Sequence, residues 1–157
     1  MWRICLGLLF VLAVSPAHAW NGQVVATTDG DSLKIQASSG EIVKIRLYGI
    51  DCPELGQPLG IEAQQAVQKI SLHQIVTVDA HYIDRYGRTV ATVYLSDGVS
   101  LQESLLLSGL AWIDPRYCIS ANCSEWEKYE RQARAGCLGL WSHLDAMPPW
   151  EWRKKKR

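Results

Sequence analysis

Apolar and polar residues alternate over two stretches of this chain, 22–48 and 75–95, and the alternation predicts β-strands. Turn-forming residues divide each stretch: Asp29-Gly30-Asp31 and Ser38-Ser39-Gly40 in the first, and 84–87 in the second. The first stretch therefore predicts a three-stranded antiparallel meander, and the second adds two strands. The five predicted strands are 23–28, 32–37, 41–48, 75–80 and 88–95.

Helical spacing of apolar residues replaces the alternation over 60–72. Two later segments, 100–108 and 124–135, are also predicted to be helices, and Ser124 followed by Glu127 is a candidate capping box for the second. Five short strands with an inserted helix, followed by further helices, are typical of a small barrel of the oligonucleotide-binding (OB) kind. We therefore predict an α+β fold, mainly β, with a five-stranded OB barrel and about three helices.

The first nineteen residues have the features of a secretory signal peptide. Arg3 provides a positive start, residues 4–14 are apolar, and Ala17-His18-Ala19 fits the small-residue cleavage pattern. The apolar run is shorter than the roughly 20 residues that a membrane span needs. We expect residues 1–19 to be removed, with an uncleaved anchor as the alternative, and the mature protein to be secreted or periplasmic and free of the membrane.

The remaining chain is expected to form one domain, 20–147, followed by a basic tail, 148–157. Five of the Lys and Arg residues lie in 153–157, so that residues 20–152 hold ten basic and sixteen acidic residues. The tail is expected to be mobile. No heptad repeat is visible, and we therefore expect a monomer.

Four cysteines lie beyond the predicted signal peptide: Cys52, Cys118, Cys123 and Cys137. An even number in an oxidising compartment favours disulfides. Cys118 and Cys123 flank a short polar segment and are the favoured pair, which leaves Cys52 either bonded to Cys137 or, like Cys137, free. A zinc site is disfavoured, because the sequence has no Cys-x-x-Cys pair and its histidines lie at no metal-ligand spacing.

Carboxylates and arginines recur around the predicted turns in a combination that suits phosphodiester hydrolysis. Asp31 and Asp51 could supply oxygen ligands to a hard cation such as Ca²⁺, and Glu54 is a candidate base. Arg46 and Arg88 carry planar guanidinium groups that can hold two phosphate oxygens at once. Each group alone could be a turn residue or an ion-pair partner. Together they favour calcium-dependent cleavage of a nucleic acid, with local arginines and the cation compensating for the acidic body.

Several ordered motifs resemble those of the staphylococcal nuclease (thermonuclease) family, over residues 24–141. The resemblance implies an OB barrel with three helices and calcium-dependent hydrolysis of DNA and RNA that leaves 3′-phosphate ends. The matching stretches are 28–33, 46–54, 84–88, 107–111 and 139–141.

The resemblance also implies roles by position. It makes Asp31, Asp51 and the backbone carbonyl of Cys52 the calcium ligands. Asp29 would lie next to these ligands without binding the ion itself. It makes Glu54 the general base or the group that positions the attacking water.

Substrate contacts follow from the same resemblance. It makes Arg46 and Arg88 the phosphate-binding arginines that stabilise the phosphorane-like transition state, and places Arg85 and Tyr86 against a terminal phosphate. Tyr117 would stack under a base, but a proline two residues earlier stands where the best-known member of the family has a second tyrosine.

Two alternatives to this interpretation remain. OB barrels also bind single strands without catalysis, although such modules rarely need an intact acid cluster. The basic tail could hold DNA, or it could be a solvated charged end. We expect the substrate to be DNA and RNA that is single-stranded or transiently unpaired.

Overall fold

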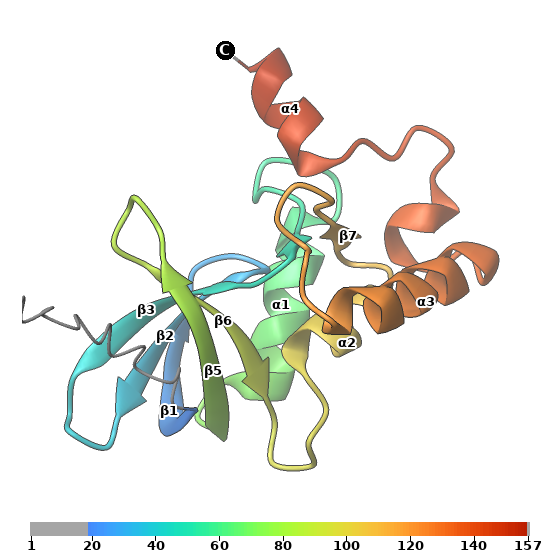
Figure 1. The fold of residues 1–157 in the computed structure, drawn as a ribbon. Helices are drawn as coiled ribbons and strands as arrows, with labels where there is room; N and C mark the ends of the chain where they lie inside the picture. The colour runs from blue at the N-terminus through green and yellow to red at the C-terminus, as the bar shows by residue number, and fades with distance from the viewer. Residues whose placement is uncertain (1–18, 157) are drawn as a thin grey trace, which may run out of the picture.

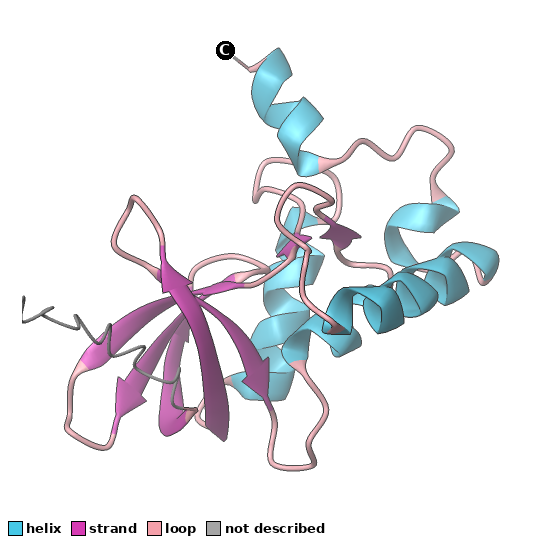
Figure 2. Cartoon of the chain, viewed as in Figure 1, coloured by secondary structure: helices cyan, strands magenta, loops and turns pink. Residues whose placement is uncertain are grey.

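Five strands close into a β-barrel on one side of the molecule, and helices gather on the other side (Figure 1, Figure 2). This computed structural model describes residues 19–156. The strand order around the barrel is β1-β2-β3-β6-β5, in which β3 and β6 are parallel and the other neighbouring pairs are antiparallel. The barrel strands are β1 (Trp20–Thr27), β2 (Ser32–Ala37), β3 (Ile42–Leu47), β5 (Ile75–Ile83) and β6 (Thr89–Tyr94).

This architecture confirms the predicted α+β fold with a five-stranded OB-type barrel. Leu33 and Ile35 on β2 and Ile45 and Leu47 on β3 are buried in the core. Each large apolar side chain that is buried in this way contributes about 1.5–3 kcal/mol to folding. Because side chains alternate along a strand, Arg46 lies on the face opposite to its two buried neighbours and reaches a cleft outside the barrel.

The helices lie together on one side of the barrel (Figure 1). Ala63 and Val67 of the first helix are fully buried in the barrel core. The second helix is capped by Ser100, whose Oγ accepts a hydrogen bond from the backbone N–H of Glu103 at 3.0 Å. The helices are α1 (Gly60–Ser71), α2 (Leu101–Leu107), α3 (Asn122–Ala135), the 3₁₀-helix η1 (Gly139–Ser142) and α4 (Pro149–Lys155).

The predicted capping box at Ser124 and Glu127 is wrong. Helix α3 begins at Asn122, and its N-cap residue, Ala121, makes no side-chain capping bond within the described chain. Ser124 lies inside the first turn and donates its hydroxyl to the carbonyl of Ala121 at 3.1 Å. The disulfide between Cys118 and Cys123 holds the chain just before Ser124. The helix therefore starts at Asn122, two residues earlier than the start predicted at Ser124.

Cys118 and Cys123 form a disulfide, as predicted. Within residues 19–156, Cys52 and Cys137 are free thiols, the first buried and the second exposed. The alternative in which Cys52 bonds to Cys137 is therefore wrong.

A small second sheet joins the barrel to the helical side. Strand β4 (Ile50–Asp51) pairs with β7 (Trp112–Ile113), so that Asp51 lies opposite Trp112. Two-residue strands are too short to show a periodic pattern, and the sequence did not predict them. The pairing holds the segment after β3 against the chain that leads into α3.

The tail, which was expected to be mobile, instead contains a helix, α4, which lies beyond β7 and the loop that leads into α1, away from the barrel strands (Figure 1). The predicted signal peptide lies outside the described residues except for Ala19. Between residues 19 and 156, no helix has both the length and the apolar character needed to cross a membrane.

Candidate active site

A cleft of about 780 Å³ lies where β3 leads into β4 and where the turn between β5 and β6 approaches them. The nine residues to which the sequence assigned a catalytic, metal-binding or substrate-binding role, and Asp29 behind the metal ligands, all contribute to its lining. The cleft therefore brings together predicted residues that are up to 88 positions apart in the sequence, Asp29 and Tyr117. These ten residues are Asp29, Asp31, Arg46, Asp51, Cys52, Glu54, Arg85, Tyr86, Arg88 and Tyr117.

Backbone structure positions the two buried aspartates on opposite sides of Arg46. Asp31 ends the turn before β2, where its N–H donates to Asp29 Oδ1 at 3.0 Å and its carbonyl accepts from the N–H of Leu47 at 2.8 Å. Asp51 is held by the β4–β7 pairing. The turn and the strand pairing thus bring Asp31 and Asp51 to one point of the cleft.

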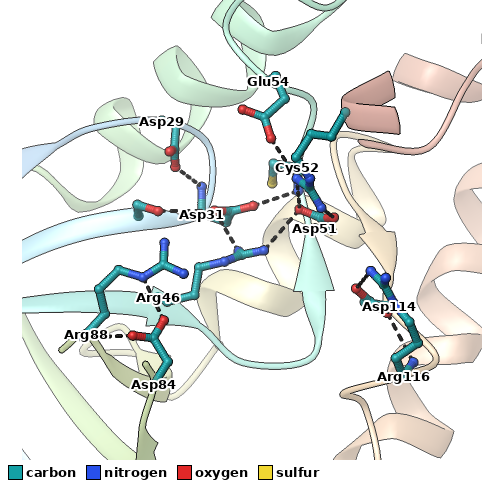
Figure 3. Close-up of polar contacts among 12 residues, drawn as sticks. Asp29, Asp31, Arg46, Asp51, Cys52, Glu54, Asp84, Arg88, Asp114 and Arg116 are labelled. Carbon is teal, nitrogen blue, oxygen red and sulfur yellow. Dashed lines mark hydrogen bonds and ion pairs between the residues drawn. The ribbon is translucent and has the colours of Figure 1, made fainter. Parts of the chain in front are cut away.

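Arg46 forms an ion pair with each aspartate (Figure 3). Its Nη1 lies 2.6 Å from Asp31 Oδ1, and its Nη2 lies 3.0 Å from Asp51 Oδ1. Burial alone would lower the pKa of Arg46, but the charges of Asp31 and Asp51 raise it above its ordinary value. The guanidinium group therefore stays charged and holds the two carboxylates together.

One nitrogen of this guanidinium group has hydrogen-bonding capacity to spare. Arg46 Nη1 is buried, and among the described residues its one polar partner is Asp31 Oδ1, so that at least one of its two N–H groups has no acceptor. A buried N–H without an acceptor costs about 1–3 kcal/mol. An oxygen atom of a bound phosphate could satisfy it.

Asp31 is a buried carboxylate whose pKa is shifted by its surroundings. Its Oδ2 accepts the backbone N–H of Cys52 at 2.7 Å. Burial raises its pKa to about 7, and neither the hydrogen bond from Cys52 nor the charge of Arg46 offsets this effect. Arg46 thus compensates the negative charge of the ionised carboxylate only in part, and a bound cation could add positive charge.

The donor set fits a hard cation with few protein ligands. Asp31 and Asp51 are buried carboxylates, and Cys52 follows directly with its backbone carbonyl. Burial raises the pKa of the Cys52 thiol well above its ordinary value, so that the sulfur stays protonated and is a poor ligand. In the described part of the chain, no three His, Cys, Asp or Glu side chains converge at metal-binding distance. Water and substrate would therefore have to complete a calcium shell of six to eight oxygens.

Arg88 is positioned by Asp84 at the turn between β5 and β6 (Figure 3). Asp84 Oδ2 accepts from Arg88 Nε at 2.8 Å, and its Oδ1 accepts the backbone N–H groups of Tyr86 at 2.9 Å and Arg88 at 3.0 Å. Although partial burial opposes the shift, these hydrogen bonds keep the pKa of Asp84 below its usual value. The Tyr86 ring, 66% exposed, lies beside the guanidinium groups of Arg85 and Arg88 at 4.9 and 5.5 Å.

Tyr117 lines the cleft from a loop that is anchored before and after it. Asp114 is buried and pairs with Arg116 through a 2.6 Å contact from Nη2 to Oδ2 (Figure 3). The Arg116 guanidinium lies 5.4 Å from the Tyr117 ring. The hydroxyl of Tyr48 accepts the backbone N–H groups of Ile119 at 3.0 Å and of Ser120 at 3.1 Å. The loop that carries Tyr117 is thus anchored on both sides of that residue.

The sequence interpretation missed Arg153, Asp114 and Arg116. Arg153 Nη1 lies 2.6 Å from Glu54 Oε1, and its Nη2 lies 2.6 Å from Asp51 Oδ2. The sequence placed Arg153 in a charged tail, although Pro148-Pro149 before it is a recognised start signal for a helix. No local pattern indicates that this helix reaches the carboxylates.

Comparisons with known proteins agree with this geometry. Residues 44–143 match the family model described as staphylococcal nuclease homologue. A micrococcal nuclease from Shigella flexneri is 34% identical over 157 aligned residues, which cover 94% of this chain and 89% of that protein. An uncharacterized endonuclease from Escherichia coli O157:H7 is 34% identical over 136 residues, 87% of this chain and 86% of that protein.

Plant relatives are longer. The staphylococcal-like nuclease CAN1 from Arabidopsis thaliana is 41% identical over 114 residues, 73% of this chain but 34% of the plant protein. The chain thus spans between about a fifth and a third of the length of the plant proteins it matches and most of the length of the bacterial ones. Because the family model covers more than half of the chain and the bacterial relatives are matched over most of their length, the chain belongs to the staphylococcal nuclease family.

Proposed function

We propose that this protein is a calcium-dependent nuclease that hydrolyses phosphodiester bonds of DNA and RNA and leaves 3′-phosphate ends. Membership of a nuclease family supports hydrolysis of nucleic acid. The observation that carries the finer proposal is the convergence of Asp31, Asp51 and Glu54 with Arg46 and Arg88 in one cleft.

The proposed cation site consists of Asp31, Asp51 and the carbonyl of Cys52. Calcium bound there would neutralise phosphate charge and polarise a water molecule. The raised pKa of Asp31 supports this assignment, because a cation favours the ionised form that burial disfavours. The two carboxylates and one carbonyl would bind calcium weakly until a substrate phosphate adds its oxygens.

The chain's own side chains would then act on the phosphate and the water. Arg46 offers a buried N–H that lacks an acceptor, and Arg88 is held at the cleft by Asp84. Both guanidinium groups would stabilise the charge that grows on the equatorial oxygens in the phosphorane-like transition state. Glu54 would accept the proton of the attacking water or orient that water.

The exposed aromatic rings support a substrate that is single-stranded or transiently unpaired. Tyr86 and Tyr117 are 66% and 55% exposed at the cleft and could contact bases that a closed duplex would keep stacked. We further propose that the mature protein is a monomer that acts in the periplasm or outside the cell, in keeping with the disulfide between Cys118 and Cys123.

The direct test is hydrolysis of heat-denatured DNA and of RNA by the purified mature protein, with calcium and with chelator. The proposal predicts cleavage by wild type in calcium alone, products that end in 3′-phosphate, and strong loss in Glu54→Gln. Glu62→Gln is the matched control, because Glu62 is exposed in the first turn of α1, outside the cleft lining. DNA binding without cleavage by folded wild type would instead support a noncatalytic OB-type binding module.

A further inference from the structure

Arg153 places a positive charge between two acidic residues of the proposed active site. Its Nη2 contacts Asp51 Oδ2 at 2.6 Å, and its Nη1 contacts Glu54 Oε1 at 2.6 Å and Asp51 Oδ1 at 3.3 Å. Arg46 Nη2 also contacts Asp51 Oδ1, at 3.0 Å. Both oxygens of the buried Asp51 carboxylate are therefore paired with arginines.

The same guanidinium group engages Glu54. One oxygen of this proposed base accepts a hydrogen bond from Arg153, and the pairing orients the carboxylate toward α4. Burial alone would lower the pKa of Arg153, but the hydrogen bonds to Asp51 and Glu54 raise it, so that the group remains charged. In this arrangement an arginine occupies the ligand atoms that a cation and a catalytic water would need.

Few contacts hold α4 in place. The side-chain amide of Gln57 donates to the carbonyl of Met147 at 2.5 Å, Pro149 is buried, and the guanidinium group of Arg116 lies 5.5 Å from the ring of Trp150. A helix of seven residues is too short to be stable in water by itself. Its position thus depends on these contacts and on the ion pairs of Arg153.

We propose that Arg153 acts as an internal competitor of the metal: its guanidinium group occupies Asp51 and Glu54 in the absence of calcium and leaves them when calcium and substrate bind. This inference rests on the proposed calcium-dependent function. Two cations that share one buried carboxylate repel each other strongly where water is excluded. By thermodynamic linkage, if calcium binding displaces Arg153 from the carboxylates, then Arg153 must lower the affinity of the site for calcium.

The competition predicts that α4 sets the calcium concentration at which the site becomes active. With Arg153 in place, three carboxylates, Asp31, Asp51 and Glu54, face two guanidinium groups. Removal of one guanidinium group leaves more negative charge for an incoming divalent cation. Calcium affinity should therefore rise when Arg153 is neutralised.

The test compares Arg153→Gln with Lys154→Gln in the full mature chain. Lys154 lies next to Arg153 on α4 but pairs with Glu151 at 2.8 Å, so that its variant removes the same charge from the same helix without altering the cleft. The unfolding temperature of each protein is measured over a calcium titration without nucleic acid, and the dissociation constant is taken from the calcium-dependent increase. Arg153→Gln should bind calcium roughly 5-fold or more tightly than wild type, within the usual range of coupling between sites. Lys154→Gln should match wild type.

A third variant and a second readout separate the possible outcomes. Arg153→Lys keeps the charge but loses the two-pronged contact, and its calcium affinity should lie between those of wild type and Arg153→Gln. Cleavage by Arg153→Gln should reach half of its maximal rate at a lower calcium concentration than cleavage by wild type.

Equal or weaker calcium binding by Arg153→Gln would overturn the inference, and a lower rate at saturating calcium would show that Arg153 contacts the substrate instead. If Arg153→Gln binds calcium more tightly but no variant cleaves nucleic acid, the proposed nuclease function fails and the competition stands. If wild type cleaves and the affinities are equal, only the competition fails.

Discussion

Arg88 lies with its Nε 2.8 Å from Oδ2 of Asp84, the residue that also accepts two backbone N–H groups of the same turn. The carboxylate thus fixes both the shape of the turn and the direction of the guanidinium group that lines the cleft. A phosphate-binding arginine held in this way has less conformational freedom to lose when substrate arrives.

Replacement of Asp84 by Asn should reduce catalysis while the turn persists. The amide oxygen can still accept the N–H groups of Tyr86 and Arg88, but the ion pair with Arg88 Nε is lost. We expect the maximal rate of DNA cleavage to fall roughly 10- to 100-fold, the cost of a misplaced catalytic group. Asp97→Asn is the control, because Asp97 accepts the N–H of Val99 in a turn outside the cleft lining. Equal rates for the two variants would argue against a positioning role for Asp84.

Arg46→Ala should destabilise the protein strongly. This arginine compensates two buried carboxylates, and removal of one partner from a buried ion pair costs about 3–5 kcal/mol. Urea unfolding of the calcium-free protein would measure the loss. The matched change Arg131→Ala affects an exposed pair with Glu127 at 3.7 Å and should cost less than about 1 kcal/mol. If Arg46→Ala lost as little stability as Arg131→Ala, the two buried carboxylates would not depend on the positive charge of Arg46.

Arg88→Ala should act on the rate rather than on the stability. Its guanidinium group is partly exposed and pairs with a surface turn, so that its removal exposes no buried charge. We expect cleavage to slow roughly 10²- to 10³-fold, as with the loss of one transition-state donor in other hydrolases. Steady-state cleavage at saturating calcium, together with urea unfolding, separates the two effects. Wild-type turnover in this variant would remove Arg88 from the catalytic set.

The stability of the calcium-free protein should fall as the pH rises from about 4 to about 7, because of Asp31. The native protein keeps the Asp31 proton up to a pKa of about 7, whereas the unfolded chain releases it near 3.8. The native state therefore binds more protons over this window, and the free energy of unfolding decreases with pH. This contribution of Asp31 to the free energy of unfolding is fully present below about pH 4 and lost above about pH 7.

Urea unfolding in the presence of chelator, for wild type and Asp31→Asn, would measure this effect of Asp31. The difference in unfolding free energy between the two proteins cancels the contributions of the other groups that titrate in the window. The free energy of unfolding of wild type should fall relative to that of Asp31→Asn as the pH rises from about 4 to about 7. A difference that is independent of pH would contradict a raised pKa of Asp31.

Replacement of both Cys118 and Cys123 by Ser should lower stability by about 2 kcal/mol, the chain-entropy value for a loop this short. It should also weaken substrate binding, because the disulfide closes the loop that follows Tyr117. Unfolding free energy and the KM for single-stranded DNA are the measurements. Cys137→Ser, at an exposed free thiol, should change neither quantity. An unchanged KM in the double variant would indicate that the contacts of Tyr48 and Arg116 suffice to hold Tyr117.

The sequence by itself determined the barrel, its five strands and ten of the residues that line the cleft. Strand alternation and turn chemistry are local properties: Leu33 and Ile35 are buried because every second residue of β2 faces the same side. The turns around Asp31 and Asp84 likewise owe their shape to side chains that bond to the backbone a few residues away. Motifs of this kind can be identified from sequence because their geometry is decided within about ten residues.

Only the tertiary structure decided how the charges are paired. Arg46 links Asp31 to Asp51, and Arg153 reaches Asp51 from 102 residues further along the chain. The two-residue pairing of β4 with β7 also joins segments that are far apart in the sequence. The physical reason is that an ion pair or a short strand pairing is favourable only once folding of the rest of the chain has brought both partners together and excluded water from them, and no local pattern carries that information.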